Sequence, residues 1–201
     1  MKLDLHISDS FDEQKQNELS DISASLKFKC KKTAYHYQQV QNLTKRSSIF
    51  DTANYYEEVN LPIYYESENF LIAIRSSVDV LMHYLSVFFD LNLSAKDVNV
   101  HSVYKHNKIP KGVKNTFHQY TRPYQNNIWL FIYEHRNEIV HQKSFDQILP
   151  IRIDLFSSDV PLIFLDWKGE EKELLTLYGA SLRFLENFIS QINQSIKLSI
   201  P

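Results

Sequence analysis

Glycine and cysteine are both scarce in this chain of 201 residues. Its 3 glycines are too few for architectures built from many tight turns, and they disfavour glycine-rich loops that cradle phosphates. The single cysteine, Cys30, excludes an internal disulfide and a zinc site made of several thiolates. Because a lone thiol is compatible with a reducing compartment, we expect a cytoplasmic protein.

Long apolar segments are also missing. The longest wholly apolar run covers about residues 128–133, whereas a helix needs roughly 20 apolar residues to cross a bilayer. The first seven residues alternate between apolar and polar side chains and lack the continuous apolar core of a signal peptide. We therefore expect neither export nor a membrane-bound protein.

Neither sign of charge is in excess. The 22 basic and 24 acidic residues give a formal net charge of −2, so binding to nucleic acid requires a local basic patch. The charged share of 23% and the hydrophobic share of 43% are typical of folded soluble chains. At this length, we expect residues 1–201 to form a single domain.

Apolar periodicity predicts four long helices, at residues 12–43, 66–90, 123–143 and 170–197. The clearest pattern lies in the second, where apolar residues recur at spacings of four and three: Phe70, Ile74, Val78, Leu81, Leu85 and Phe88. We expect this helix to be central and buried. The fold class is therefore predicted to be mainly α, an antiparallel four-helix bundle.

A small β-hairpin is predicted at about residues 150–166, before the last helix. Residues 151–155 alternate with period two, and residues 162–165 form a short apolar run after a polar turn. The N-terminal residues Leu3, Leu5 and Ile7 alternate in the same way, so they could extend the sheet by one strand.

Three residues near the end of the third predicted helix form a motif: Arg136, Asn137 directly after it, and His141 after four intervening positions. The motif resembles the Arg-x(4 to 6)-His motif of the HEPN superfamily, helical-bundle proteins that include metal-independent ribonucleases. The resemblance covers about residues 12–197 in helix order. It implies a HEPN-like bundle that forms a homodimer, with both copies of the motif in one RNA-cleaving cleft.

The same three residue types suit cleavage of RNA by its own 2′-hydroxyl. The His141 imidazole can transfer protons near neutral pH, the Arg136 guanidinium suits phosphate oxygens, and Asn137 can orient either group. On a straight helix, Arg136 and His141 are separated by about 140° and about 7.5 Å, so a dimer or a frayed helix end must bring them together. The alternative is structural: Arg136 pairs with a carboxylate and His141 caps the helix end.

A second candidate group lies on the central helix, where Arg75, Asp79 and His83 are spaced by four and share one face. In a supporting role, this stripe lines the cleft and Asp79 orients His83 or Arg136. The alternative is an ion pair within the helix that is buried with satisfied partners.

Residues 98–133 contain no acidic side chain, and we call them the basic segment. Its cations and interleaved aromatic rings offer phosphate contacts and stacking surfaces for unpaired RNA bases. The predicted RNA-binding residues are Lys105, Lys108, Lys111, Lys114, Arg122, Tyr104, Tyr120 and Tyr124. The alternative is a solvated basic loop whose aromatic side chains pack into the bundle.

These features predict a HEPN-like, metal-independent endoribonuclease that acts on RNA as a homodimer. The resemblance also implies a toxin or defence component with an antitoxin or another protein partner. We predict no metal and no cofactor, because the histidines show no zinc-binding signature. The alternative function is a noncatalytic HEPN-type module that binds RNA, a nucleotide or a protein.

Overall fold

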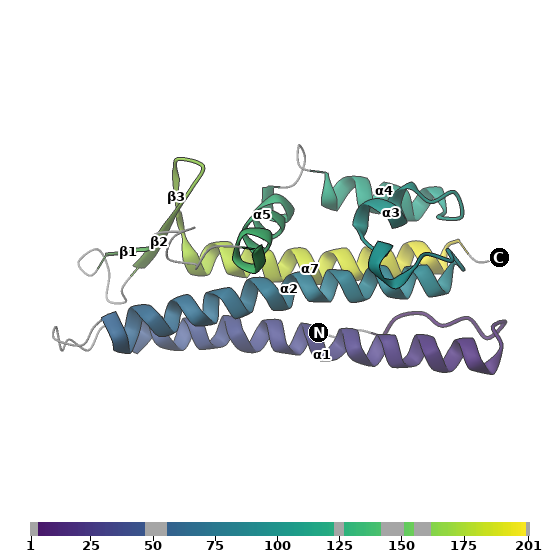
Figure 1. The fold of residues 1–201 in the computed structure, drawn as a ribbon, viewed down its shortest axis with the longest axis horizontal. Coiled ribbons are helices and arrows are strands. Elements are labelled where there is room, and N and C mark those ends of the chain that lie inside the picture. The colour runs from purple at the N-terminus through teal and green to yellow at the C-terminus, as the bar shows by residue number, and fades with distance from the viewer. Residues whose placement is uncertain (1–3, 47–55, 123–126, 142–150, 155–161, 200–201) are drawn as a thin grey trace.

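The computed structural model describes residues 4–46, 56–122, 127–141, 151–154 and 162–199. Three long helices run along its longest axis: α1 (Glu13–Arg46), α2 (Leu61–Phe88) and α7 (Leu174–Lys197). Helix α1 packs along α2, and both contact α7 (Figure 1). A five-residue π-helix, η1 (Tyr56–Asn60), leads into α2, whose first turn contains Pro62. The prediction of a mainly helical chain is confirmed.

Helix α2 is buried along most of its length, as its apolar pattern predicts. Phe70, Ile74 and Val78 are fully buried, and so are Leu81 and Leu85. Phe70 stacks on Tyr178 of α7, with 4.3 Å between the ring centroids. This helix therefore forms the centre of the core, and its polar residues are the exceptions that need an explanation.

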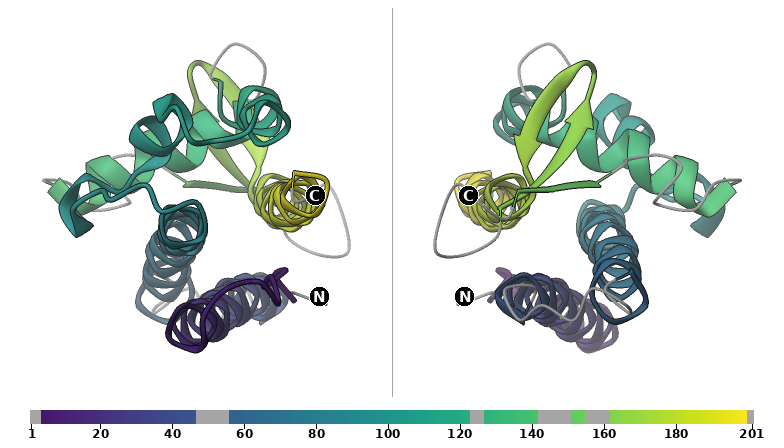
Figure 2. Two further views of the ribbon diagram at one scale, coloured as in Figure 1. Left: turned by 90° about the vertical axis from the view of Figure 1, so that its right-hand side faces the viewer. Right: turned by 90° about the vertical axis from the view of Figure 1, so that its left-hand side faces the viewer.

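Helix α5 (Asn127–His141) runs across α2 and α7 and contacts both (Figures 1 and 2). Its position corresponds to the third predicted helix, although the expected first residues, 123–126, and the last, 142–143, lie outside the described residues. The end-on views of Figure 2 show α5 lying nearly perpendicular to the long axis. One face of α5 is consequently directed along the molecule, toward the segment that precedes it.

Much of the described part of the basic segment is helical, whereas the structural alternative expected a solvated loop. A short 3-10 helix, η2 (Ala95–Asp97), is followed by α3 (Val100–Lys105) and α4 (Lys111–Thr121). Asn99 caps α3: its Oδ1 accepts hydrogen bonds from the backbone N–H groups of His101 and Ser102, each at 3.0 Å. Helix α3 contacts α2, whereas α4 packs mainly on α7. This packing, which local signals do not report, holds the segment in place.

The predicted hairpin is confirmed: β1 (Ile151–Asp154) pairs antiparallel with β2 (Leu162–Trp167). A third strand, β3 (Glu170–Glu173), extends the sheet in the order β1-β2-β3. The prediction that a helix begins at residue 170 is therefore wrong by four residues. Lys168 and Gly169 have positive φ values of 58° and 77°, and this tight turn directs the chain back along β2 before α7 begins.

The predicted N-terminal strand is not formed by the described residues 4–7. This segment lies against α2 and α7, where side chains bind its backbone. The His6 N–H donates to Asn193 Oδ1 at 2.8 Å, and the Tyr84 hydroxyl donates to the His6 carbonyl oxygen. Because these side chains satisfy the backbone groups, the segment needs no strand partner at this point.

Candidate functional site

A cavity of about 710 Å³ lies where α2, α3, α4 and α5 meet. This volume is within the range of small-molecule sites, roughly 300–1,000 Å³. The cavity joins the basic segment to the helix that carries the Arg136 motif. Its lining residues are Arg75, Asn99, Val100, His101, Tyr104, Lys105, Phe117, His118, Thr121, Arg122, Trp129, Leu130, Tyr133 and Asn137.

Helix α5 contributes Trp129, Tyr133 and Asn137, which are spaced by four and form one stripe along the helix. We call these three residues the α5 stripe. Residues four apart lie one above another on the same helical face, so the backbone places position 141 one turn beyond Asn137. The side chain of His141 itself lies outside what the structure describes.

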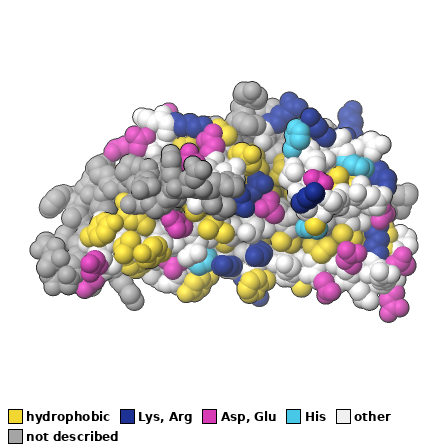
Figure 3. Space-filling model, viewed as in Figure 1, with side chains coloured by type: hydrophobic (Ala, Val, Ile, Leu, Met, Phe, Trp, Pro, Cys, Tyr) yellow, Lys and Arg dark blue, Asp and Glu magenta, His cyan; other side chains and the backbone are white. Residues whose placement is uncertain are grey.

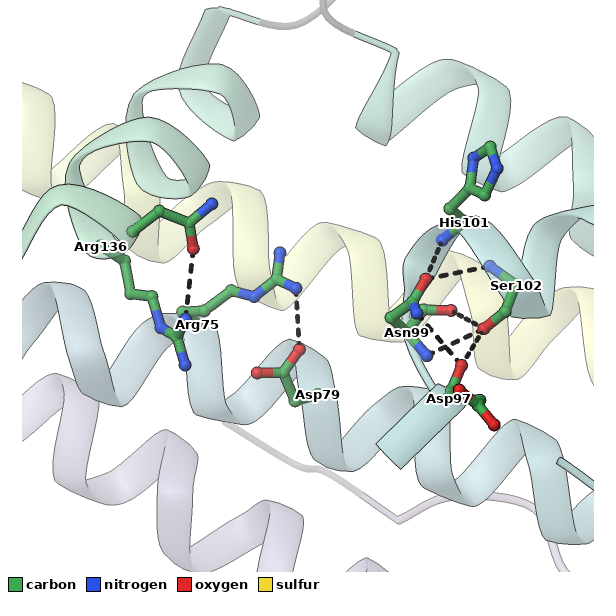
Figure 4. A network of polar contacts seen from close by, with 8 residues as sticks. Arg75, Asp79, Asp97, Asn99, His101, Ser102 and Arg136 are labelled. Atoms are coloured by element: carbon green, nitrogen blue, oxygen red, sulfur yellow. Dashed lines mark hydrogen bonds and ion pairs between the residues drawn. The ribbon is translucent and has the colours of Figure 1, made fainter. Parts of the chain in front are cut away.

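Arg136 does not belong to the cavity lining given above. Its Nη1 donates a hydrogen bond to Asn137 Oδ1 at 3.2 Å (Figure 4). Asn137 thus connects Arg136 to the cavity, because its side chain lines the cavity and accepts a hydrogen bond from Arg136. Within one chain, α5 is continuous from Asn127 to His141, so the angular separation expected between Arg136 and His141 applies.

Helix α2 contributes Arg75, whose side chain is only 10% exposed. Its Nη2 pairs with Asp79 Oδ1 at 3.0 Å, as Figure 4 shows. The guanidinium carbon lies 4.9 Å from the Trp129 ring centroid and 5.3 Å from that of Tyr133. The ion pair within the helix that the structural alternative expects is therefore present, and its arginine also lies against two rings of the α5 stripe.

Asp79 and His83, the other two members of the candidate group on α2, differ from Arg75 in their surroundings. Asp79 is 37% exposed at its side chain, and its carboxylate holds the Arg75 guanidinium. His83 is exposed, and it is not among the residues that line the cavity. The structure therefore brings one of these three residues to the cavity directly and a second through an ion pair.

Three of the eight predicted RNA-binding residues line the cavity: Tyr104, Lys105 and Arg122. Arg122 Nη2 donates to the Tyr104 hydroxyl at 3.2 Å, which holds the cation beside the ring. Figure 3 shows basic and histidine side chains gathered over the part of the surface where Figure 1 places α3 and α4. Positive charge is therefore concentrated at the rim of the cavity and around it.

The remaining predicted RNA-binding residues lie elsewhere. Lys108 Nζ donates to the backbone carbonyl of Asp90, and Lys111 and Lys114 are on α4 outside the cavity lining. Tyr120 packs against Phe184 and Phe188 with ring centroids 6.0 Å and 5.5 Å apart, as the alternative of aromatic packing expects. Tyr124 lies outside the described residues.

Sequence reasoning missed several residues of the site. It did not single out Trp129, Tyr133, His101, His118 or Asn99 as ligand contacts. The available signal was the four-residue spacing of Trp129, Tyr133 and Asn137, which predicts a shared face. That signal does not show that the face borders a cavity.

Metal-ligating groups do not converge in this region. Among the residues that the structure describes, no group of three or more His, Cys, Asp or Glu side chains is placed to hold a metal ion. The cavity lining itself contains cations, amides, hydroxyls and rings, and none of its named residues is a carboxylate. This donor set suits an anionic, partly aromatic ligand better than a hard cation.

No family model matches the chain, and no curated protein or solved structure is significantly similar to it. The fold and the cavity define a mainly helical protein with a cationic, aromatic-lined cavity. Of the described helices, the continuous stretch Tyr56–Phe88 is long and apolar enough to cross a membrane, and 67% of its most apolar window is buried inside the structure. Such burial is a property of core helices.

Proposed function

We propose that this chain binds single-stranded RNA at the cavity and cleaves it without a metal ion, as a HEPN-like endoribonuclease. One observation carries the proposal: the cavity joins cations and rings of the basic segment to Asn137, the central residue of the sequence motif. Lys105 and Arg122 supply charge for backbone phosphates. Tyr104 and Tyr133 supply aromatic surface for unpaired bases.

The proposed reaction needs only groups that this chain carries. The RNA 2′-oxygen attacks the adjacent phosphorus, its proton passes to a base, and the 5′-oxygen leaves with a proton from an acid. The products are a 2′,3′-cyclic phosphate and a 5′-hydroxyl. His141 serves as the proton-transfer group, and Arg136 stabilises the charge that develops on the phosphate oxygens.

A homodimer is part of this proposal. Arg136 and position 141 do not share a face of α5, so groups from two chains meet more readily than groups from one. A twofold axis beside the end of α5 would place the same surface of both subunits together. The proposal also retains the HEPN-like four-helix bundle, a cytoplasmic location, and an antitoxin or another protein as partner.

Cleavage in the presence of EDTA tests the activity. We expect the wild-type protein to cut a labelled single-stranded RNA in EDTA, and His141→Ala to lower the cleavage rate at least about a hundredfold, the size typical of lost general acid–base catalysis. His106→Ala is the matched control, because this histidine does not line the cavity. An RNA with a 2′-deoxy residue at the cut position should resist cleavage there.

Two results contradict this activity: equal cleavage by His141→Ala and wild type, or cleavage that stops in EDTA and returns with added metal. Sedimentation of the wild type and His141→Ala checks that the substitution leaves the oligomeric state unchanged. A monomer with full cleavage activity would overturn the composite site.

The second candidate function is binding of RNA or a nucleotide without cleavage. One contact favours it: the Arg136 guanidinium is engaged by Asn137 of its own chain, at 3.2 Å, and Arg136 does not line the cavity. This function predicts tight RNA binding with no cleavage product after prolonged incubation, and His141→Ala would then leave the affinity unchanged.

A further inference from the structure

Arg75 is an unusual residue for the centre of α2. Its neighbours along the helix, Ala73, Ile74 and Val78, are core residues with at most 2% exposure, yet the guanidinium is nearly as buried as they are. A permanent cation in such a place carries a large desolvation cost unless its donors find partners. Its presence therefore calls for an explanation in the cavity that it lines.

The partners of Arg75 account for only part of its hydrogen-bonding capacity. Nη2 pairs with Asp79, whereas Nε and Nη1 are buried and find no hydrogen-bond partner within the described part of the chain. Trp129 and Tyr133 attract the guanidinium through their ring faces, but rings do not replace oxygen acceptors. The cavity wall thus contains a cation with two donors that are unpaired within the described residues, and both are closed to solvent in this structure.

The surroundings of Arg75 select the sign and the shape of a ligand. Lys105 and Arg122 add two further permanent cations to the lining, and none of the described residues that line the cavity is an aspartate or a glutamate. An anion is therefore favoured. Val100, Phe117 and Leu130 supply apolar surface to the same space, which suits a ligand with a flat, weakly polar portion besides its charge.

We propose that Arg75 anchors the phosphate group of one nucleotide unit in this cavity. The phosphate oxygens accept hydrogen bonds from Nε and Nη1, which the side chains that cover them uncover when the ligand binds, while Asp79 holds the guanidinium in position. The base lies against the apolar lining. We call this the phosphate subsite. It rests on the proposed function in one respect, since the nucleotide is taken to be a unit of an RNA strand.

Asp79 acts here as a positioning residue. Its carboxylate pairs with Nη2 and leaves Nε and Nη1 without a partner among the described residues. The ligand therefore meets a guanidinium that is already oriented. Preorganisation of this kind lowers the ordering cost of binding.

Titration calorimetry with adenosine 5′-monophosphate, adenosine and inorganic phosphate tests the subsite. We expect the wild type to bind the monophosphate at least about tenfold more tightly than adenosine, and inorganic phosphate to compete with it. Arg75→Met keeps the length of the side chain and removes its donors, and it should weaken monophosphate binding at least about tenfold. Arg75→Lys retains the charge without the planar donor set and should fall between the two.

Arg183→Met is the matched control, because Arg183 is an exposed arginine of α7 outside the cavity lining. It should bind as the wild type does. Thermal unfolding of each variant shows whether it is folded at the temperature of the titration. Should Arg75→Met fail to fold, Arg75→Lys alone decides the question, since equal affinity for that variant would contradict a phosphate held by a guanidinium fork.

An uncleavable 2′-O-methyl oligonucleotide separates this inference from the proposed function. If the wild type binds the oligonucleotide but not the monophosphate, and Arg75→Met loses oligonucleotide affinity, then the subsite binds a phosphate of an RNA strand. Arg75-dependent binding of the monophosphate by a protein that binds no oligonucleotide keeps the subsite and overturns the RNA function. Equal ligand binding by Arg75→Met and wild type overturns the subsite alone, and a wild type that binds none of the ligands overturns both.

Discussion

Replacing Arg75 by methionine should change the stability of this protein very little, although it removes a buried charge. The substitution removes two buried donors without partners, each of which costs about 1–3 kcal/mol. It also removes the ion pair with Asp79, whose carboxylate is 37% exposed, and screening by water at that partner limits the contribution of the pair to about 1 kcal/mol. Two cation–π contacts are lost as well, at about 0.5–2 kcal/mol each.

These gains and losses are of similar size. We therefore expect the free energy of unfolding to change by less than about 2 kcal/mol, and the melting temperature by less than about 8 °C for a chain of this length. A purely structural role for the pair predicts a different result, because removing one partner of a buried ion pair typically costs about 3–5 kcal/mol.

Asp79→Ala provides the contrasting variant. It leaves the Arg75 guanidinium, with a side chain that is 10% exposed, without its counter-charge, whereas Arg75→Met leaves a half-buried carboxylate that water still reaches. Asp79→Ala should therefore destabilise the protein more, by about 3 kcal/mol. The double variant Arg75→Met/Asp79→Ala should return to within about 1 kcal/mol of Arg75→Met alone.

Urea unfolding followed by circular dichroism measures all four proteins, with the dependence on urea concentration checked for equality between them. A loss of 3 kcal/mol or more in Arg75→Met refutes this reasoning, since the arginine would then be a structural anchor. So does an Asp79→Ala variant that is as stable as Arg75→Met.

Two further predictions concern buried groups away from the cavity. Burial lowers the pKa of His135 below its ordinary value of 6.5, against the opposing effect of Glu138 and Glu134, so the unfolded chain takes up a proton first as the pH falls. The free energy of unfolding should therefore decrease below about pH 6.5 by up to about 1.4 kcal/mol per pH unit. His135→Phe should flatten this dependence on pH, and parallel profiles for the variant and the wild type contradict the prediction. Burial raises the pKa of the Cys30 thiol to about 11, so iodoacetamide should modify it at pH 8 at least about a hundredfold more slowly than it modifies a free thiol. Mass spectrometry follows that reaction, urea should restore the ordinary rate, and fast modification of the folded protein is the opposing outcome.

The long elements follow from local sequence. Apolar spacing of four and three identified α2, and period-two alternation in residues 151–155 identified the strand that pairs with β2. In both cases the repeat of apolar residues in the sequence matches the geometry of the element, so a short window contains the information.

The residues at which prediction failed depend on pairing and packing that apolar periodicity does not report. Residues 170–173 are all charged and were assigned to the last helix, yet pairing with β2 makes them a strand. The turn at Lys168 and Gly169 decides this, and Glu173 then caps α7 by accepting a hydrogen bond from the Leu175 N–H at 3.0 Å. Helix α4 likewise depends on packing against α7.

For the candidate site, the sequence by itself determined the residue types: a basic segment without carboxylates, a motif of arginine, asparagine and histidine, and a polar stripe on an apolar helix. Only the tertiary structure decided which of these residues meet. The transverse course of α5 places Trp129 and Tyr133 against the Arg75 guanidinium, and α3 and α4 close the cavity with Lys105 and Arg122 while Lys108 is directed to Asp90. The physical reason is that hydrophobic periodicity specifies which face of a helix is buried, whereas the angle at which two helices cross depends on how their side chains fit together.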